Sequence, residues 1–284
     1  MQGNRIGDRL VLSLFHGRAL LARFHSARQC ASFCAVSTQP ANLQRTPRLY
    51  VVAPLEAGGA VTLHDRQAHY LLHVLRLQKG ATFRLFNGSD GEWLAEIVEA
   101  RKRDLVLKCE RKLRDAQPLP DIDYLFAPLK HARLDYLAQK ATEMGAGRLR
   151  PVITRRTIAE RMNVDRFKSN VIEAAEQCNL VGLPVVLEPE PLDRVIAGWD
   201  DLRRLIYCDE VGPAANPLRV LKEIEPGPLA VLIGPEGGFA PEEQKLLRNQ
   251  KFVTAISLGP RIMRADTAAV AALALVQAVL GDWR

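Results

Sequence analysis

The pattern of hydrophobic positions changes near residue 115 and divides the chain into two parts. Before that point hydrophobic residues form short runs separated by turn residues such as Asn87-Gly88 and Asp90-Gly91, which is typical of strands joined by tight turns. One helix is predicted at about 67–75. The strands are predicted at 49–53, 60–63, 82–87, 92–98 and 104–109. We therefore expect a small β-rich barrel or sandwich, followed by a proline-containing linker at 115–120.

After the linker, strands alternate with helices. Strands are predicted at 122–128, 149–154, 184–188, 204–209, 229–234 and 254–258. Helices are predicted at about 132–144 and 164–178, from Pro241, and from about Asp266. Such alternation indicates an α/β fold with a mostly parallel sheet that helices cover on both faces.

Composition and charge narrow the range of partners. The 284 residues are 48% hydrophobic and 25% charged, which is the composition of a globular protein of one large or two ordinary domains. The formal charge is +7, but residues 1–47 hold six Arg, no Lys and only Asp8, so the rest carries just +2. This argues against a histone-like polyanion binder. Basic clusters at 101–103, 111–114 and 148–156 leave open both nucleic-acid contact and an ordinary solvated surface.

The first 47 residues are rich in Arg and poor in acids, as mitochondrial transit peptides are. A start codon assigned too far upstream in a bacterial gene would explain them equally well. We therefore treat residues 1–47 as an N-terminal extension outside the folded part.

The cysteines and the apolar runs argue against a metal-binding, a disulfide-stabilised and a membrane-anchored protein. The five Cys residues form no Cys-x-x-Cys pair and no Cys/His metal spacing, so we expect neither a metal site nor a disulfide framework. The longest apolar run, 268–280, contains Gln277 and is too short to span a bilayer. We expect it to be a buried helix of a soluble protein without a membrane anchor.

A glycine-rich turn follows the buried strand at 229–234. The segment reads Gly234-Pro-Glu-Gly-Gly238 and leads to Pro241, a residue favoured in the first turn of a helix. Glycines at the carboxyl end of a parallel strand let the backbone approach a ligand such as the adenine or ribose of a cofactor. A tight turn without a ligand is the alternative. The segment matches neither the phosphate-loop nor the dinucleotide-binding fingerprint.

A second segment, residues 257–267, follows the next strand and contains Arg261, Arg264, Asp266 and Thr267. Asp266 or Thr267 is expected to cap the final helix, because a side-chain oxygen there accepts from free N–H groups. The two arginines indicate an anion, a phosphate or a carboxylate. The two loops would form one pocket if their strands are neighbours in the sheet.

The ordered set of motifs resembles the RsmE family of 16S rRNA (uracil-N3) methyltransferases, in the SPOUT superfamily. The resemblance covers about residues 48–284. The C-terminal motifs are Gly234–Gly238, Leu258-Gly-Pro-Arg-Ile-Met-Arg264 and Ala265-Asp-Thr-Ala268. The upstream motifs are His73-Val-Leu-Arg-Leu77, Phe86-Asn-Gly88, Pro128-Leu-Lys130, Gln139-Lys-Ala-Thr-Glu-Met-Gly145 and Ala174-Ala-Glu-Gln-Cys178.

This resemblance implies a PUA-like RNA-binding β-barrel at 48–115 and a trefoil-knotted SPOUT methyltransferase domain at 121–284. It implies S-adenosyl-L-methionine as cofactor, methylation of N3 of a uridine in 16S ribosomal RNA of the small subunit, and a homodimer. The expected location is the bacterial cytoplasm, or the mitochondrion if residues 1–47 are a transit peptide.

The resemblance also implies site residues. Arg264 and Asp266 are the expected catalytic pair. The expected cofactor-binding residues are Leu232, Gly234, Pro235, Glu236, Gly237, Gly238, Leu258, Gly259, Arg261, Ile262 and Met263. The expected RNA-binding residues are Arg48, Arg76, Arg101, Lys102, Arg103 and Lys130.

The chain departs from the family pattern twice. Relatives commonly have Gly-Arg where this chain has Asn179-Leu180, and Glu where Asp266 stands. The first departure motivates an alternative, a non-catalytic ribosome-binding or assembly factor on the same fold. A SPOUT methyltransferase with another RNA target is a further alternative.

Overall fold

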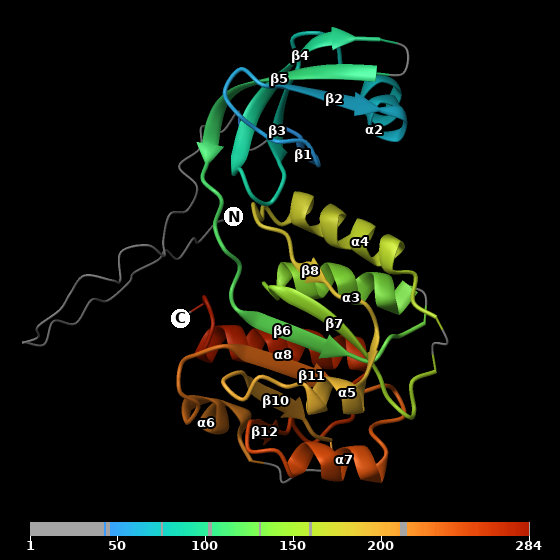
Figure 1. The fold of residues 1–284 in the computed structure, drawn as a ribbon, viewed down its shortest axis with the longest axis vertical. Coiled ribbons are helices and arrows are strands. Elements are labelled where there is room, and N and C mark those ends of the chain that lie inside the picture. Colours follow the sequence, from blue (N-terminus) through green and yellow to red (C-terminus); the bar gives the residue numbers. More distant parts are fainter. Residues whose placement is uncertain are drawn as a thin grey trace, which may run out of the picture. The chain divides into compact units, whose positions relative to one another are not determined.

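The computed structural model describes Leu43 and residues 46–283, apart from 75, 102–103, 131, 159–160 and 211–214. The extension predicted for residues 1–47 therefore lies outside the described residues, except for Leu43, Thr46 and Pro47. Thr46–Arg284 belong to one compact unit. Within it, two sheets follow one another along the chain (Figure 1).

The first sheet has five strands in the order β1-β3-β4-β5-β2. Its strands are β1 (Arg48–Tyr50), β2 (Ala60–His64), β3 (Thr82–Phe86), β4 (Glu92–Ala100) and β5 (Asp104–Arg114). β1 runs parallel to β3, and the other pairs are antiparallel. Helix α2 (Asp65–His69) and the π-helical turn η1 (Tyr70–Val74) connect β2 to β3. The sheet curls around its own core, which includes Phe83, Leu85 and Leu107 (Figure 1).

The five predicted strands and the helix of this part are confirmed, but three strands differ in their bounds. β1 ends at Tyr50 rather than at residue 53, and β4 ends at Ala100 rather than at residue 98. β5 continues to Arg114, whereas the hydrophobic pattern predicted its end at residue 109. The extra residues are mostly charged and exposed, but their backbone stays paired with the start of β4. Ladder hydrogen bonds, rather than side-chain burial, therefore define this end of the strand.

The second sheet is parallel, in the order β12-β10-β11-β6-β7-β8, and β9 pairs with β7. Its strands are β6 (Ile122–Phe126), β7 (Arg148–Ile153), β8 (Val185–Val186), β9 (Glu190–Pro191), β10 (Arg204–Cys208), β11 (Leu229–Ile233) and β12 (Val253–Ile256). Its helices are α3 (Ala132–Glu143), α4 (Val164–Gln177), α5 (Leu192–Ala197), α6 (Pro217–Lys222), α7 (Pro241–Arg248) and α8 (Ala265–Val279).

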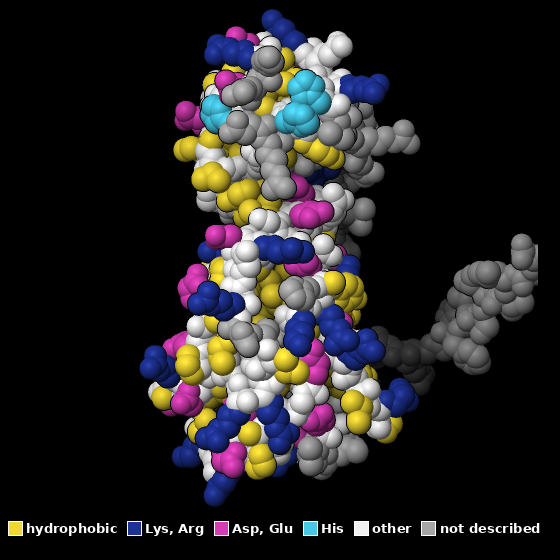
Figure 2. Space-filling model, turned by 90° about the vertical axis from the view of Figure 1, so that its right-hand side faces the viewer, with side chains coloured by type: hydrophobic (Ala, Val, Ile, Leu, Met, Phe, Trp, Pro, Cys, Tyr) yellow, Lys and Arg dark blue, Asp and Glu magenta, His cyan; other side chains and the backbone are white. Residues whose placement is uncertain are grey.

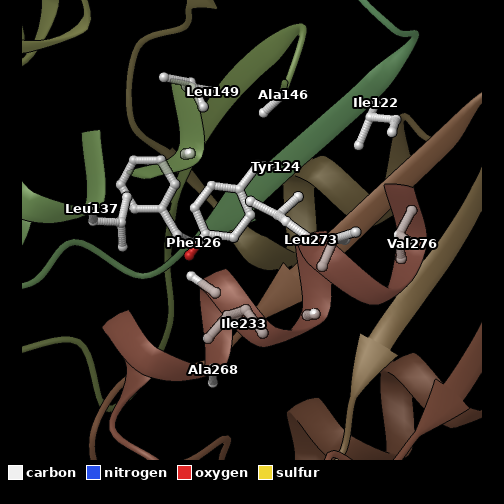
Figure 3. Packing of buried hydrophobic residues seen from close by; sticks show 14 of the residues in the cluster. Ile122, Tyr124, Phe126, Leu137, Ala146, Leu149, Ile233, Ala268, Leu273 and Val276 are labelled. Atoms are coloured by element: carbon white, nitrogen blue, oxygen red, sulfur yellow. The ribbon is translucent and has the colours of Figure 1, made fainter. Parts of the chain in front are cut away.

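Helices cover both faces of this sheet, as the sequence predicts. Alternate side chains of a strand point to opposite faces, so Tyr124 and Phe126 belong to one core with α3 and α8, while Leu125 belongs to the other with α5 and α7. Figure 3 shows Tyr124 and Phe126 among residues of α8, including Leu273. Their rings stack with centroids 5.3 Å apart. The short helices α5 and α6 were not predicted, because six residues are too few to show a helical period.

A buried ionic cluster joins the first sheet to the end of α4. We call Glu92, Arg48, Arg84, Arg114 and Asn179 the Glu92 cluster. Glu92 is fully buried and accepts from Arg48 Nε at 2.6 Å and from Arg114 Nε at 2.8 Å. Asn179 has φ of +68°, and its Oδ1 accepts from Arg84 at 3.3 Å and from Arg114 at 3.2 Å.

Arg48 makes most of the connection to α4. Its guanidinium also donates to the backbone oxygens of Ala175 at 2.7 Å, Glu176 at 2.9 Å and Leu180 at 2.6 Å. Burial alone would raise the pKa of Glu92, but hydrogen bonds and charges from Arg114 and Arg48 outweigh it and lower the pKa below its ordinary value. Glu92 is therefore an ionised, fully paired carboxylate.

Candidate active site

A cavity opens at the carboxyl ends of β10, β11 and β12. The two glycine loops both contribute to it, although the condition set for a shared pocket, that their strands are neighbours, is not met, because β10 lies between β11 and β12. The end of β10 therefore forms the middle of the cavity. The lining residues are Tyr207, Cys208, Asp209, Glu210, Ile233, Gly234, Pro235, Glu236, Gly238, Phe239, Ser257, Leu258, Gly259, Pro260, Arg261, Ile262, Met263, Ala265 and Ala268.

The first loop, residues 234–240, is called the glycine loop below. Gly238 has φ of +66°, and its N–H donates to Pro235 O at 2.9 Å, which closes a tight turn. A Cβ at Gly238 would lie 2.2 Å from Glu210 Oε1, and one at Gly234 would lie 2.6 Å from the Phe239 ring. Both positions therefore require glycine. After the loop, α7 begins at Pro241 as predicted.

Two residues expected to bind the cofactor do not line the cavity. Leu232 is fully buried in the core shared with α5 and α7, because alternate residues of β11 point to opposite faces of the sheet. Gly237 faces away from the cavity, and its carbonyl oxygen accepts from Arg156 Nη1 at 2.8 Å. The other nine expected residues all line the cavity.

The second loop joins β12 to α8. Gly259 has φ of +113°, and a Cβ there would meet nothing within 4 Å, so its backbone borders open space. Ile262 is 93% exposed. Arg261 is exposed and lines the cavity, and Arg264 is exposed at the position before α8. For Arg261 and Arg264, the described residues provide no ion-pair partner.

The final helix begins at Ala265, one residue earlier than predicted. Arg264, not Asp266, occupies the N-cap position, without a side-chain capping bond. Asp266 Oδ1 accepts from the Thr267 N–H at 2.8 Å, so Asp266 does satisfy a free donor of the first turn. Neither Arg264 nor Asp266 lines the cavity itself. Arg264 lies between the lining residues Met263 and Ala265 in the sequence, and Asp266 follows Ala265.

The end of β10 is the part of the site that the sequence did not reveal. Asp209 is buried and pairs with Arg248 of α7 at 2.6 Å. Burial, followed by the charge of Asp209, raises the pKa of Tyr207. Burial also raises the pKa of the Cys208 thiol to about 12, so the thiol is neutral at neutral pH. Acidic residues directly after a buried strand, Asp209 and Glu210, were the available signal.

The expected RNA-binding residues occupy different environments. Arg48 belongs to the Glu92 cluster, with a side chain only 4% exposed, so it has no guanidinium surface to offer RNA. Arg76 is exposed, with φ of +54°. Arg101 is exposed but pairs with Glu99 at 2.8 Å, and Lys130 is exposed after β6. Lys102 and Arg103 lie outside the described residues.

Metal and membrane features were searched over the described part of the chain. It holds no group of three or more His, Cys, Asp or Glu side chains arranged to bind a metal. Nor does any helix there have the length and hydrophobicity that crossing a bilayer requires.

Comparison with known protein families identifies the class. Residues 116–277 match the RNA methyltransferase domain, and residues 63–109 match the RNA methyltransferase PUA domain. The parallel sheet with its cavity and the sheet before it are therefore the two parts of an RNA methyltransferase of the SPOUT type.

Full-length relatives identify the particular family. The ribosomal RNA small subunit methyltransferase E of Rickettsia conorii is 32% identical over 236 residues, 81% of this chain and 94% of that protein. The corresponding structure from Neisseria gonorrhoeae, bound to S-adenosyl methionine, has 26% identity and a TM-score of 0.73, covering 84% of this chain and 100% of that one. A methyltransferase from Legionella pneumophila in complex with the cofactor SAM has 27% identity and a TM-score of 0.72, covering 82% and 98%. The chain belongs to the ribosomal RNA small subunit methyltransferase E family.

Proposed function

We propose that the cavity binds S-adenosylmethionine and that the protein methylates N3 of a uridine in small-subunit ribosomal RNA. The observation that carries this proposal is the convergence of both glycine loops on one cavity. That cavity offers the chemistry the cofactor needs: apolar Leu258 and Ile233 for an adenine, carboxylates for hydroxyls or an amine, and Arg261 for a carboxylate. The open space beside Gly259 leaves room for a ligand to approach the backbone.

Bound S-adenosylmethionine supplies an electrophilic methyl group, while the protein handles position, charge and the N3 proton. Arg264 is exposed and has no acidic partner among the described residues, so its guanidinium is available to stabilise the negative charge that develops on the uracil. Asp266 uses Oδ1 for the Thr267 N–H. Its Oδ2 accepts no bond within the described part of the chain and can take the N3 proton, directly or through a water.

Two variants test these roles. Arg264→Ala should lose turnover while keeping its affinity for S-adenosylmethionine in calorimetry. Asp266→Asn should lower the rate about 10²- to 10⁴-fold if Asp266 takes the proton, and only a few-fold if it orients Arg264. Arg219→Ala, which removes an 85% exposed arginine of α6, is the matched control. Wild-type turnover in Arg264→Ala contradicts the assignment.

The target nucleotide is tested in cells. Mass spectrometry of small-subunit RNA nucleosides from cells that lack the gene should show loss of 3-methyluridine, which the wild-type gene restores. Unchanged 3-methyluridine would contradict the proposed product. The departure Asn179-Leu180, which motivated a non-catalytic alternative, does not touch the cavity. Asn179 belongs to the Glu92 cluster, Leu180 O accepts from Arg48 of that cluster, and neither residue lines the cavity.

RNA is proposed to bind the exposed basic residues Arg76, Arg101 and Lys130, and binding should weaken steeply with salt. Figure 2 shows Lys and Arg side chains spread over the part of the molecule that carries the parallel sheet. Arg76→Ala should weaken RNA binding and leave cofactor binding unchanged. Equal RNA affinity of this variant and the wild type would remove Arg76 from the site.

The protein is further proposed to be a cytoplasmic homodimer. Partly exposed apolar residues of α8, including Val270 and Leu275, and the exposed Ile262 support a second copy as the partner for this surface. Sedimentation should give a mass of two 31.6 kDa chains at micromolar concentration. A mass of one chain would refute the dimer.

A further inference from the structure

The segment after β7 is attached directly to the glycine loop. We call residues 154–157 the β7 loop. Its own shape is fixed, because Thr154 N donates to Thr157 Oγ1 at 2.8 Å and the two hydroxyls lie 2.9 Å apart. The β7 loop does not line the cavity, so its attachment is not explained by direct contact with a cofactor.

One buried carboxylate joins the two loops. Glu243 is 8% exposed, and its Oε1 accepts from the Arg155 N–H at 2.8 Å while Oε2 accepts from the Ala240 N–H at 2.8 Å. Because both bonds go to backbone donors, Glu243 sets the distance between the backbones of the two loops. This places the side chain of Arg156 beside the glycine loop.

Two guanidinium groups then hold adjacent residues of the glycine loop. Arg156 Nη1 donates to Gly237 O at 2.8 Å, and a Cβ at Gly237 would lie 3.6 Å from Arg156 Cδ. Arg133, in the first turn of α3, places Nη1 3.3 Å from Glu236 Oε1. Glu236 lines the cavity, whereas Gly237 faces outward. The glycine loop is thus held by one arginine of the β7 loop and one of α3.

We propose that Arg156 and Arg133 are positioning residues that hold the glycine loop in its cofactor-binding shape, and that a phosphate of the substrate RNA binds the remaining donors of Arg156. This inference rests on the proposed function. A guanidinium has five N–H donors, and among the described residues Arg156 uses one of them, in the bond to Gly237. Its side chain is exposed, so the other donors face the solvent from which RNA arrives. A phosphate there fixes the guanidinium over Gly237, so RNA and cofactor strengthen each other's binding.

The test compares neighbouring arginines. Arg155 and Arg156 are both exposed, but only the Arg156 side chain contacts the glycine loop. The Arg155 side chain meets Glu242, also exposed, at 3.9 Å. Arg155→Ala therefore removes the same charge and keeps the loop contact. Arg204→Ala removes a half-buried arginine that donates to a backbone oxygen, Lys251 O at 2.6 Å. Arg204 lies at the start of β10, at the opposite end of this strand from the cavity.

S-adenosylmethionine affinity is measured by calorimetry on the full chain, with and without a small-subunit RNA fragment. Arg156→Ala should bind the cofactor about tenfold more weakly, as expected for losing a charge-assisted hydrogen bond, while Arg155→Ala and Arg204→Ala match the wild type. RNA should tighten cofactor binding a few-fold in the wild type and not in Arg156→Ala. The KM values for both substrates should rise in Arg156→Ala, with kcat at saturation falling less than tenfold.

The outcomes separate this inference from the proposed function. A wild type that binds no S-adenosylmethionine contradicts the proposed function. A wild type that binds it, with an Arg156→Ala variant of equal affinity, overturns the positioning role. Cofactor affinity that RNA leaves unchanged in the wild type overturns the coupling. Thermal unfolding of Arg156→Ala close to that of the wild type excludes a general loss of structure.

Discussion

The Glu92 cluster and the rim of the cavity use the same side chain in opposite surroundings. In the Glu92 cluster, Arg48 is 4% exposed and each of its three guanidinium nitrogens has an acceptor within the protein. At the cavity, Arg261 and Arg264 are exposed, and no acidic partner lies among the described residues. Arginines of the first kind maintain the fold, because removing any partner leaves a buried charge unpaired. Arginines of the second kind are available to a ligand.

The Glu92 cluster also accounts for Asn179, a residue with an unusual backbone conformation. Its left-handed backbone, φ +68°, turns the chain after α4, and its carbonyl and side-chain oxygens accept from arginines of the first sheet. Asn tolerates this conformation better than most residues other than Gly. The departure from the family pattern therefore belongs to the connection between the two sheets.

The largest expected effect comes from neutralising the centre of the Glu92 cluster. Glu92→Gln leaves the buried guanidinium of Arg48 without its counter-charge and should reduce the free energy of unfolding by about 3–5 kcal/mol. Urea unfolding monitored by circular dichroism measures it. Glu223→Gln, at a 71% exposed residue paired with Arg219 at 3.9 Å, should change stability by less than about 0.5 kcal/mol. If the two variants lost equal free energy of unfolding, the buried ion pairs of Glu92 would be no more important for stability than an exposed pair.

A smaller effect is expected within the cavity wall. Gly238→Ala places a Cβ at φ +66° and 2.2 Å from Glu210 Oε1, so it should cost about 1–2 kcal/mol of stability and weaken cofactor binding. Gly227→Ala is the control, since a Cβ there meets nothing within 4 Å and φ is not positive. Stability and cofactor affinity unchanged in Gly238→Ala would show that the loop adopts another shape.

Acid unfolding sharpens the comparison further. The folded-state pKa of Glu92 lies below its ordinary value of 4.5, so its contribution to stability is present above that value. It is lost as the pH falls through the folded pKa. As the pH is lowered from 5, we expect the free energy of unfolding to decrease less in Glu92→Gln than in the wild type. Parallel curves for both proteins, measured by urea unfolding at a series of pH values, would contradict this.

The smallest effect on stability is expected at the cavity rim. Arg261→Ala removes an exposed arginine that has no acidic partner among the described residues, so stability should stay within about 0.5 kcal/mol of the wild type. Cofactor affinity should nevertheless fall, which calorimetry can measure. A large loss of stability would mean that Arg261 is structural, like Arg48.

The sequence predicted those parts of the fold that have a local period. Alternation and turn residues located the strands of the first sheet, and glycine loops after buried strands located nine of the cavity residues. Strand order is non-local, so the insertion of β10 between β11 and β12 could not be read from the sequence. The burial of Arg48 and the outward orientation of Gly237 could not be predicted either, because they depend on residues distant in the sequence, Glu92 and Arg156. The trefoil knot implied by the family resemblance stays a prediction.

The position of the cavity along the chain has a consequence for synthesis. All its lining residues lie between Tyr207 and Ala268, whereas the first sheet and strands β6 to β9 are complete by Pro191. A ribosome that has translated as far as residue 200 has produced the first sheet and strands β6 to β9 of the second, but no wall of the cavity. Domains fold from the N-terminus as they emerge, so the nascent chain acquires its RNA methyltransferase PUA domain well before it acquires the cavity. Premature termination between Pro191 and Tyr207 therefore yields a chain with the PUA domain and none of the cavity residues.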